Sequence, residues 1–150
     1  MPQSLSQIII HIVFSTKDRQ AIISKEIENE LYPYLATLCR SKGSECFRIG
    51  GTRDHIHIAC SLPRTMSSSE LVKALKSNSS KWINSKKFFG FRFSWQVGYG
   101  VFWIGFSNLP KLLSYIDNQK EHHKLNTFQD EMLEFYSRYS ISFDEKNVWD

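Results

Sequence analysis

The sequence lacks several features that would assign the protein to a specialised class. Its 150 residues contain no apolar run long enough to cross a membrane, and the opening Met1-Pro2-Gln3-Ser4 lacks the basic start of a secretory signal. The three cysteines form no C-x-x-C pair, which argues against a disulfide framework and against a zinc ribbon. No internal repeat or long low-complexity segment is present. We therefore expect a cytoplasmic protein with no membrane partner.

The charge of the chain is only mildly unbalanced, but it is unevenly distributed. Nineteen lysines and arginines against fifteen acidic residues leave a net charge of +4. The stretch from Lys73 to Arg92 holds six basic residues, no acidic residue and four aromatic ones: Trp82, Phe88, Phe89 and Phe91. Cations can bind phosphates and rings can stack on unpaired bases, so this composition suits nucleic acid. A solvated helix face followed by core aromatics explains it equally well.

The hydrophobic pattern predicts a single α+β domain over residues 1–150, of which 41% are hydrophobic and 14% aromatic. Strands are predicted over residues 5–14, 45–49, 55–60 and 93–104. Helices are predicted after Ser24, after the serine run 67–69, from Asn108 to about Lys124, and over 128–139. The β-α-β-β-α-β order is the ferredoxin-like split βαβ plan. We expect a mainly antiparallel sheet with helices on one face, plus a C-terminal helix.

The most informative motif is the pair His55 and His57 in the strand predicted over residues 55–60. Side chains alternate across a strand, so both histidines and Ala59 share one face, whereas Cys60 points to the other. Two imidazoles about 6.5–7 Å apart at their Cα atoms can bind one divalent metal ion. Structural histidines in sheets produce the same short motif, so the motif alone leaves both interpretations open.

The helix predicted after Asn108 supplies a second set of polar side chains. Tyr115, Gln119 and His122 recur at i, i+4 and i+7, so they share a face that borders the apolar stripe. A phenol can attack a phosphodiester and form a phosphotyrosine, and a metal would offset its weakness as a nucleophile at neutral pH. The Gln119 amide oxygen can be a third metal ligand. The alternative is a core-edge aromatic residue beside a solvated polar one.

Seven short motifs are spaced along nearly the whole chain. They are Phe14-Ser15-Thr16-Lys17-Asp18-Arg19, Asp54-His55-Ile56-His57, Lys76 with Ser79-Ser80, Trp95-Gln96-Val97-Gly98-Tyr99-Gly100, Tyr115-Ile116 with Gln119, His122-His123, and Val148-Trp149-Asp150. In this order they resemble the motifs of the IS200/IS605-type single-tyrosine transposases of the HUH endonuclease superfamily. The chain is especially similar to the REP-associated branch of that family.

The resemblance implies a role for each site residue. His55 and His57 would be metal ligands, Gln119 a further ligand, and Tyr115 the nucleophile on a catalytic C-terminal helix, with Mg²⁺ or Mn²⁺ as the ion. Either histidine of the pair His122-His123 would assist the metal or the leaving group, and the alternative is a neutral pair at the surface. Such enzymes cleave single-stranded DNA near a hairpin, hold the 5′ phosphate on the tyrosine, and reseal the strand when a second 3′ hydroxyl attacks.

The resemblance also implies partners. We expect single-stranded DNA with hairpins, association with the nucleoid when DNA is bound, and a homodimer, although members of the REP-associated branch would act as monomers. The basic residues expected to bind DNA are Lys17, Arg19, Arg53, Lys73, Lys76, Lys81, Lys86, Lys87 and Arg92.

Two other hypotheses remain open from the residues themselves. The first is a non-catalytic module that binds single-stranded nucleic acid on the same fold, with the histidines structural. The second is metal-dependent hydrolysis of a phosphodiester without a covalent intermediate. Tyr99 competes with Tyr115 for the role of nucleophile, but glycines flank it in a strand without a metal-ligating partner, and we interpret it as structural.

Overall fold

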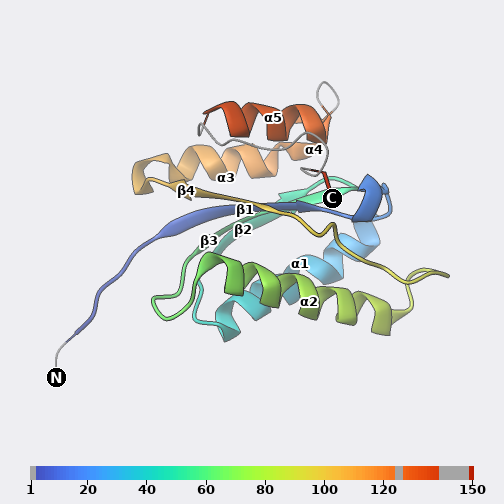
Figure 1. Ribbon diagram of the computed structural model, residues 1–150, viewed down its shortest axis with the longest axis horizontal. Helices are drawn as coiled ribbons and strands as arrows, with labels where there is room; N and C mark the ends of the chain where they lie inside the picture. Colours follow the sequence, from blue (N-terminus) through green and yellow to red (C-terminus); the bar gives the residue numbers. More distant parts are fainter. Residues whose placement is uncertain (1–2, 124–126, 139–148) are drawn as a thin grey trace.

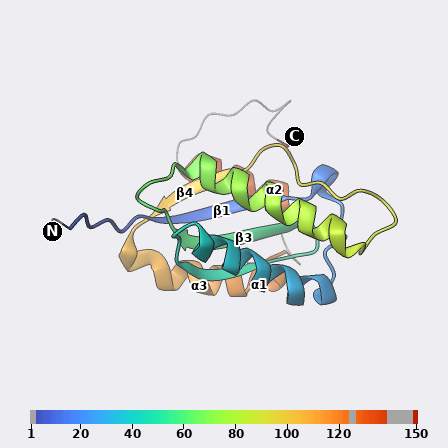
Figure 2. The same ribbon diagram turned by 90° about the horizontal axis from the view of Figure 1, so that it is seen from below.

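A four-stranded antiparallel sheet forms the centre of the protein, with strand order β2-β3-β1-β4. The computed structural model describes residues 3–123, 127–138 and 149–150. The strands are β1 (Ile9–Ser15), β2 (Cys46–Gly51), β3 (His55–Ser61) and β4 (Gly100–Ile104). The α-helices are α1 (Lys25–Ser41), α2 (Ser68–Lys86), α3 (Leu109–Asp117), α4 (Gln119–His122) and α5 (Phe128–Arg138). Helices α1 and α2 cover one face of the sheet, and α3 to α5 lie on the other (Figures 1 and 2). The predicted ferredoxin-like α+β fold is confirmed.

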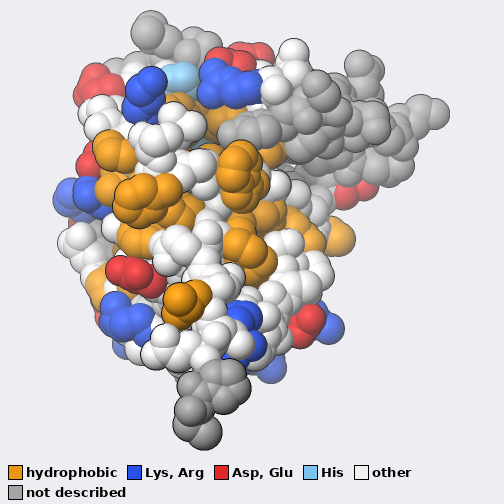
Figure 3. All heavy atoms as spheres, turned by 90° about the vertical axis from the view of Figure 1, so that its left-hand side faces the viewer, with side chains coloured by type: hydrophobic (Ala, Val, Ile, Leu, Met, Phe, Trp, Pro, Cys, Tyr) orange, Lys and Arg blue, Asp and Glu red, His pale blue; other side chains and the backbone are white. Residues whose placement is uncertain are grey.

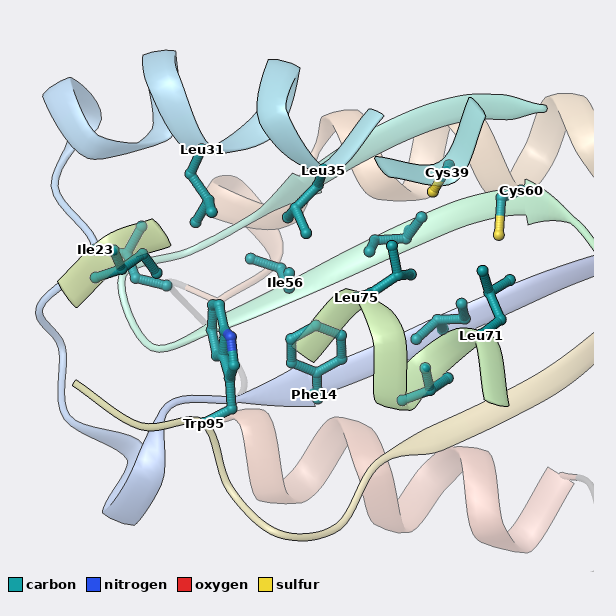
Figure 4. Close-up of a cluster of buried hydrophobic side chains, with 14 of the residues drawn as sticks. Phe14, Ile23, Leu31, Leu35, Cys39, Ile56, Cys60, Leu71, Leu75 and Trp95 are labelled. Carbon is teal, nitrogen blue, oxygen red and sulfur yellow. The ribbon is translucent and has the colours of Figure 1, made fainter. Parts of the chain in front are cut away.

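Strand β1 is buried on both faces because it lies between β3 and β4 and is covered by helices above and below. Its alternate side chains Ile10, Ile12 and Phe14 join the main hydrophobic core under α1 and α2. Figure 4 shows Phe14 in this core, with Leu35 of α1 and Leu75 of α2 near it. One face of the sheet therefore carries the main apolar core, whereas the other combines two smaller hydrophobic clusters with buried polar side chains such as His11, His55 and His57.

The first strand begins later than predicted. Leu5 was expected to start it, but the strand starts at Ile9, and Leu5 is 89% exposed. The reason is that β3 and β4 offer pairing partners only from Ile9 onward, where Ser61 and Ile104 lie opposite. Apolar character alone does not make a strand without a neighbour to accept its backbone hydrogen bonds.

The predicted strand over residues 93–104 is also shorter in the structure, since β4 covers only Gly100–Ile104. The segment before it packs on α2 instead, with a single bridge from Trp95 to Thr16. Lys76 of α2 donates hydrogen bonds from Nζ to the carbonyl oxygens of three successive residues, Gln96, Val97 and Gly98. These bonds replace the ladder that a longer strand would have formed.

The third predicted helix is interrupted. Helix α3 ends at Asp117, and Asn118 has φ −99° and ψ 15°, so α4 starts a separate turn. The predicted end at Lys124 lies outside the described residues, as do Tyr139 and Val148. The predicted helix caps are confirmed at Ser24, whose side chain accepts a hydrogen bond from the Ile27 amide, and at Ser67, which forms a capping box with Glu70.

In the part of the chain that the structure describes, no helix combines the length and the apolar character needed to cross a membrane. The cysteines Cys39, Cys46 and Cys60 are all free thiols.

Candidate metal centre

The two histidines of β3 lie on the face of the sheet that α3 to α5 cover. Both His55 and His57 are fully buried, and Ala59 on the same face packs against Leu112 and Ile116 of α3. The intervening residues of β3 join the main core on the opposite face. The predicted alternation of side chains along this strand is therefore confirmed, and the two imidazoles lie in a closed environment between sheet and helices.

Helix α3 can approach the sheet closely because β2 has a glycine where the helix crosses it. A Cβ atom built on Gly50 would lie 2.6 Å from Cγ2 of Ile116 and 2.7 Å from its carbonyl oxygen. An ion pair from Arg48 on β2 to Asp117, with N–O distances of 2.8 and 2.6 Å, fixes the end of the helix. Together these contacts hold Tyr115, the neighbour of Ile116, over the histidines.

Replacing Gly50 by alanine should therefore displace α3 from the sheet. A methyl group at this point meets helix backbone, which cannot move aside as a flexible side chain could. We expect a loss of about 1–3 kcal/mol in the free energy of unfolding, the usual range for overpacking. Urea denaturation measures this loss. Gly90→Ala is the control, because a Cβ atom at Gly90 meets nothing within 4 Å. Equal stability of the two variants would contradict the proposed close approach.

Four potential metal-ligating side chains converge above β3. One ligand atom from each of His55, His57, His123 and Glu131 lies within 4.8 Å of the others. Oε1 of Glu131 lies 2.8 Å from Nε2 of His57, and Oε2 lies 3.9 Å from Nε2 of His55. Oε2 also accepts a hydrogen bond from Nε2 of His123, and Nε2 of His122 lies 3.8 Å from it. Glu131, on α5, was not among the residues that the sequence singled out.

The polar atoms of this cluster are better arranged to bind a cation than to form hydrogen bonds with one another. Nε2 of His57 and Oε1 of Glu131 are buried and close, yet neither has a hydrogen bond of good geometry within the described residues. Burial lowers the pKa of His57 to about 4, although Glu131 opposes this shift, so the ring is neutral with a lone pair to donate. Burial disfavours the Glu131 carboxylate, but His123 and His57 hold its pKa well below the ordinary value. Neutral imidazoles and an ionised carboxylate are the donor states that a divalent ion needs.

Gln119 lies at the edge of the same cluster despite the break in the helix before it. Its Oε1 is 3.2 Å from Nε2 of His55, and the residue is buried. Lys120, the next residue, pairs with Glu28 of α1 at 2.9 Å, which ties α4 to the body of the protein. The other ring nitrogen of His55, Nδ1, lies 2.7 Å from Oδ1 of Asp54. A carboxylate behind a metal-binding histidine typically fixes its orientation.

Tyr115 stands beside the cluster in the same chain. Its ring centroid is 5.6 Å from that of His57 and 5.5 Å from that of His122. Burial raises the pKa of the phenol above its ordinary value, and the nearby Glu131 carboxylate raises it further. The phenol is therefore protonated at neutral pH. Nε2 of His122 is buried and has no hydrogen-bond partner among the described residues.

A cavity of about 480 Å³ leads from Tyr115 to the surface. Tyr115, His11 and Phe135 line it together with the cationic side chains Lys111 and Arg138. It lies where β4 ends and α3 begins, at the left of Figure 1. Figure 3 shows that side of the molecule, where hydrophobic side chains gather with both basic and acidic side chains around them. The nucleophile candidate is thus reached through a cavity that has two cationic side chains in its lining.

The basic residues expected to bind DNA lie elsewhere, mostly on the α2 side of the sheet. Lys73, Lys76, Lys81 and Arg92 line a second cavity of about 550 Å³ between α2 and the segment before β4. The Nζ of Lys76 is already bonded to three backbone carbonyls, so its charge also holds that segment in place. Tyr99 lines this cavity too. The four aromatic residues of the stretch differ in exposure: Trp82, Phe88 and Phe89 are partly buried against the main hydrophobic core, whereas Phe91 is exposed.

Comparison with known proteins is consistent across sequence and structure. Residues 4–119 match the family described as "Transposase IS200 like". The transposase for insertion sequence element IS200 of Salmonella typhimurium is 31% identical over 121 residues, which cover 77% of this chain and 78% of that protein. The same protein of Salmonella typhi matches to the same extent.

Two solved structures share the fold. One is a putative transposase from Deinococcus radiodurans, with a TM-score of 0.62, 22% identity and coverage of 79% of this chain and 98% of that one. The other is a REP-associated tyrosine transposase bound to a REP hairpin, with a TM-score of 0.61, 13% identity and coverage of 82% and 72%. The family match ends at Gln119, so His122, His123 and Glu131 lie beyond it.

Proposed function

The chain belongs to the IS200-like family of transposases, and on this premise we propose that it cleaves and rejoins single-stranded DNA through a phosphotyrosine on Tyr115. One observation carries the proposal: a tyrosine lies beside a buried cluster of metal-ligating side chains within a single chain. That arrangement brings a nucleophile next to a site for a cation, which is what phosphodiester cleavage by a phenol requires.

The proposed ligands are His55, His57, Gln119 and Glu131. Hard cations such as Mg²⁺ and Mn²⁺ prefer oxygen ligands, and Glu131 adds a negatively charged oxygen that two imidazoles and an amide lack. His123 holds the second oxygen of Glu131 by a hydrogen bond and so orients the carboxylate. When bound, the ion would polarise the phosphate oxygens and stabilise the charge that develops on them.

The cluster also influences the protonation state of the Tyr115 phenol. The Glu131 charge raises the pKa of the Tyr115 phenol. A cation held by the cluster would neutralise that charge and so lower the pKa of the phenol again. Binding of the cation and deprotonation of Tyr115 are therefore coupled. In the proposed step, the phenol oxygen bonds to phosphorus and the bond from phosphorus to the 3′ oxygen breaks. His122 accepts the phenol proton on its unpaired Nε2 and passes it to the departing 3′ oxygen.

The second half of the reaction reverses the first. A different 3′ hydroxyl attacks the phosphotyrosine, the phenol leaves, and a phosphodiester forms again without an external energy source.

The cavity lined by Lys111 and Arg138 is the proposed route by which the strand reaches Tyr115. The basic cavity along α2 is the proposed contact for the DNA outside the cleavage site. Tyr115 and the histidines lie together within one chain here, and the expected homodimer stays a prediction.

Single-stranded oligonucleotides that carry the hairpins flanking the gene of this protein test the proposal. We expect a covalent adduct on a denaturing gel in Mg²⁺ or Mn²⁺ and none in EDTA. A 3′-end label should migrate with the protein and a 5′-end label should be released, because the tyrosine retains the 5′ phosphate. Metal-dependent cleavage without an adduct would indicate hydrolysis instead. Binding without cleavage would indicate a non-catalytic module.

A further inference from the structure

His11 is a buried histidine that the proposed chemistry does not use. It lies on β1, next to β3 in the sheet, and is 2% exposed. Ala59 is its direct partner across β3, so His57 is its diagonal neighbour two residues along that strand. The small side chain of Ala59 leaves room for the two rings to approach each other on the same face.

The rings of His11 and His57 are in direct polar contact. Nε2 of His11 lies 2.7 Å from Nδ1 of His57, with the ring centroids 5.0 Å apart and the planes inclined by 24°. At this distance one of the two nitrogens must carry the proton, since two bare lone pairs would repel. A neutral imidazole has a proton on only one nitrogen, so the state of Nδ1 in His57 also decides the state of its Nε2.

Nε2 is the atom of His57 that faces the cluster, 2.8 Å from Oε1 of Glu131. A metal ion can bind it only if it carries no proton. That condition holds when Nδ1 of His57 is protonated and donates to His11. His55, the other histidine of the H-x-H motif, also has a polar partner at Nδ1, which lies 2.7 Å from Oδ1 of Asp54. Each histidine of the motif thus has a polar partner behind it, supplied by a different part of the sheet.

We propose that His11 is a positioning residue that selects the metal-binding tautomer of His57. The inference rests on the proposed metal site and adds a residue to it from a strand outside the H-x-H motif. His11 does not touch the ion. It accepts the Nδ1 proton of His57, keeps the ring from rotating, and leaves Nε2 open to the cluster. Such partners of metal-binding histidines typically change metal affinity by about 10–100-fold.

Long-range proton–nitrogen correlation spectra of the protein in saturating Mg²⁺ report the tautomer of each histidine. The ion must be present, because in the metal-free protein the Glu131 carboxylate, 2.8 Å from Nε2 of His57, favours a proton on that nitrogen. We expect His57 of the wild type to carry its proton on Nδ1 under these conditions. His11→Phe keeps a ring but removes the acceptor, so at the same Mg²⁺ concentration the proton should stay on Nε2, next to Glu131. His11→Gln places an amide group near the position of the lost nitrogen and should restore the wild-type tautomer. A wild-type tautomer in His11→Phe, or a wild-type proton on Nε2 in Mg²⁺, would overturn the inference.

Titration with Mn²⁺ alone gives the second readout. His11→Phe should weaken Mn²⁺ binding by about 10–100-fold, and His11→Gln by less. Ile12→Val is the matched control, because it disturbs packing on the same strand but on the opposite face, and it should bind Mn²⁺ like the wild type. If the wild type itself does not bind Mn²⁺, the proposed metal site is wrong and the inference falls with it. If the wild type binds and His11→Phe binds equally well, only the positioning role is refuted.

Discussion

Replacing Tyr115 by phenylalanine should abolish the covalent adduct between the protein and single-stranded hairpin DNA. The substitution removes the attacking oxygen and leaves the ring, so formation of the adduct should fall by ~10⁴-fold or more, as for other catalytic nucleophiles. The ring contacts of Tyr115 with His57 and Phe135 do not involve the hydroxyl group. Stability should therefore change by only about 1 kcal/mol. Gel analysis of the adduct and thermal unfolding measure the two effects.

Tyr34→Phe is the matched control for that experiment. Tyr34 lies on α1, on the other side of the sheet, where its ring stacks on Trp82 and its hydroxyl donates to the Asn78 carbonyl. It should form the adduct at the wild-type rate. An adduct that survives in Tyr115→Phe and disappears in another tyrosine variant would move the nucleophile to that residue. Metal-dependent cleavage that survives without any adduct would favour hydrolysis.

Replacing Glu131 by glutamine should weaken binding of Mn²⁺ strongly. Glutamine keeps the size of the side chain but replaces a charged oxygen by neutral donors and acceptors, so a hard cation loses its only anionic ligand in the described cluster. We expect a loss of at least about tenfold in Mn²⁺ affinity and a parallel fall in adduct formation at limiting metal. Isothermal titration and the adduct assay at graded Mn²⁺ concentrations measure both effects.

The control for Glu131→Gln is on the same helix. Glu134 is three residues further along α5 and is exposed, where it pairs with Arg138 at 3.0 Å. Glu134→Gln removes the same charge from α5 without reaching the cluster, and should bind Mn²⁺ like the wild type. Equal losses in the two variants would mean that α5 acts through its overall charge. No loss in either would leave His55, His57 and Gln119 as the proposed ligand set.

The sequence predicted those parts of the site that follow from local periodicity. The period of two along β3 places His55 and His57 on one face, whatever the strand pairs with. The spacing of four between Tyr115 and Gln119 keeps them close even though the helix breaks at Asn118. The strand and helix order of the fold follows from the same kind of pattern, together with caps at Ser24 and Ser67.

Glu131 and His11 could not be found in this way. Glu131 is separated from His57 by more than 70 residues, and as a single acid on a polar helix it has no spacing that marks it. His11 sits in an apolar run, where a lone histidine is most simply explained as a tolerated core residue. One weak signal existed, since a histidine that is buried inside an apolar strand must find a polar partner.

The sequence by itself determined the family, the order of elements and the residues of the H-x-H strand and tyrosine helix, because each of these is encoded by short-range patterns of side chains. Only the tertiary structure decided that β1 brings His11 behind His57, that α5 brings Glu131 above it, and that Gly50 lets the tyrosine helix descend onto the sheet. These positions depend on how elements far apart in the chain pack, and packing is settled by the fit of whole surfaces rather than by the order of residues along one of them.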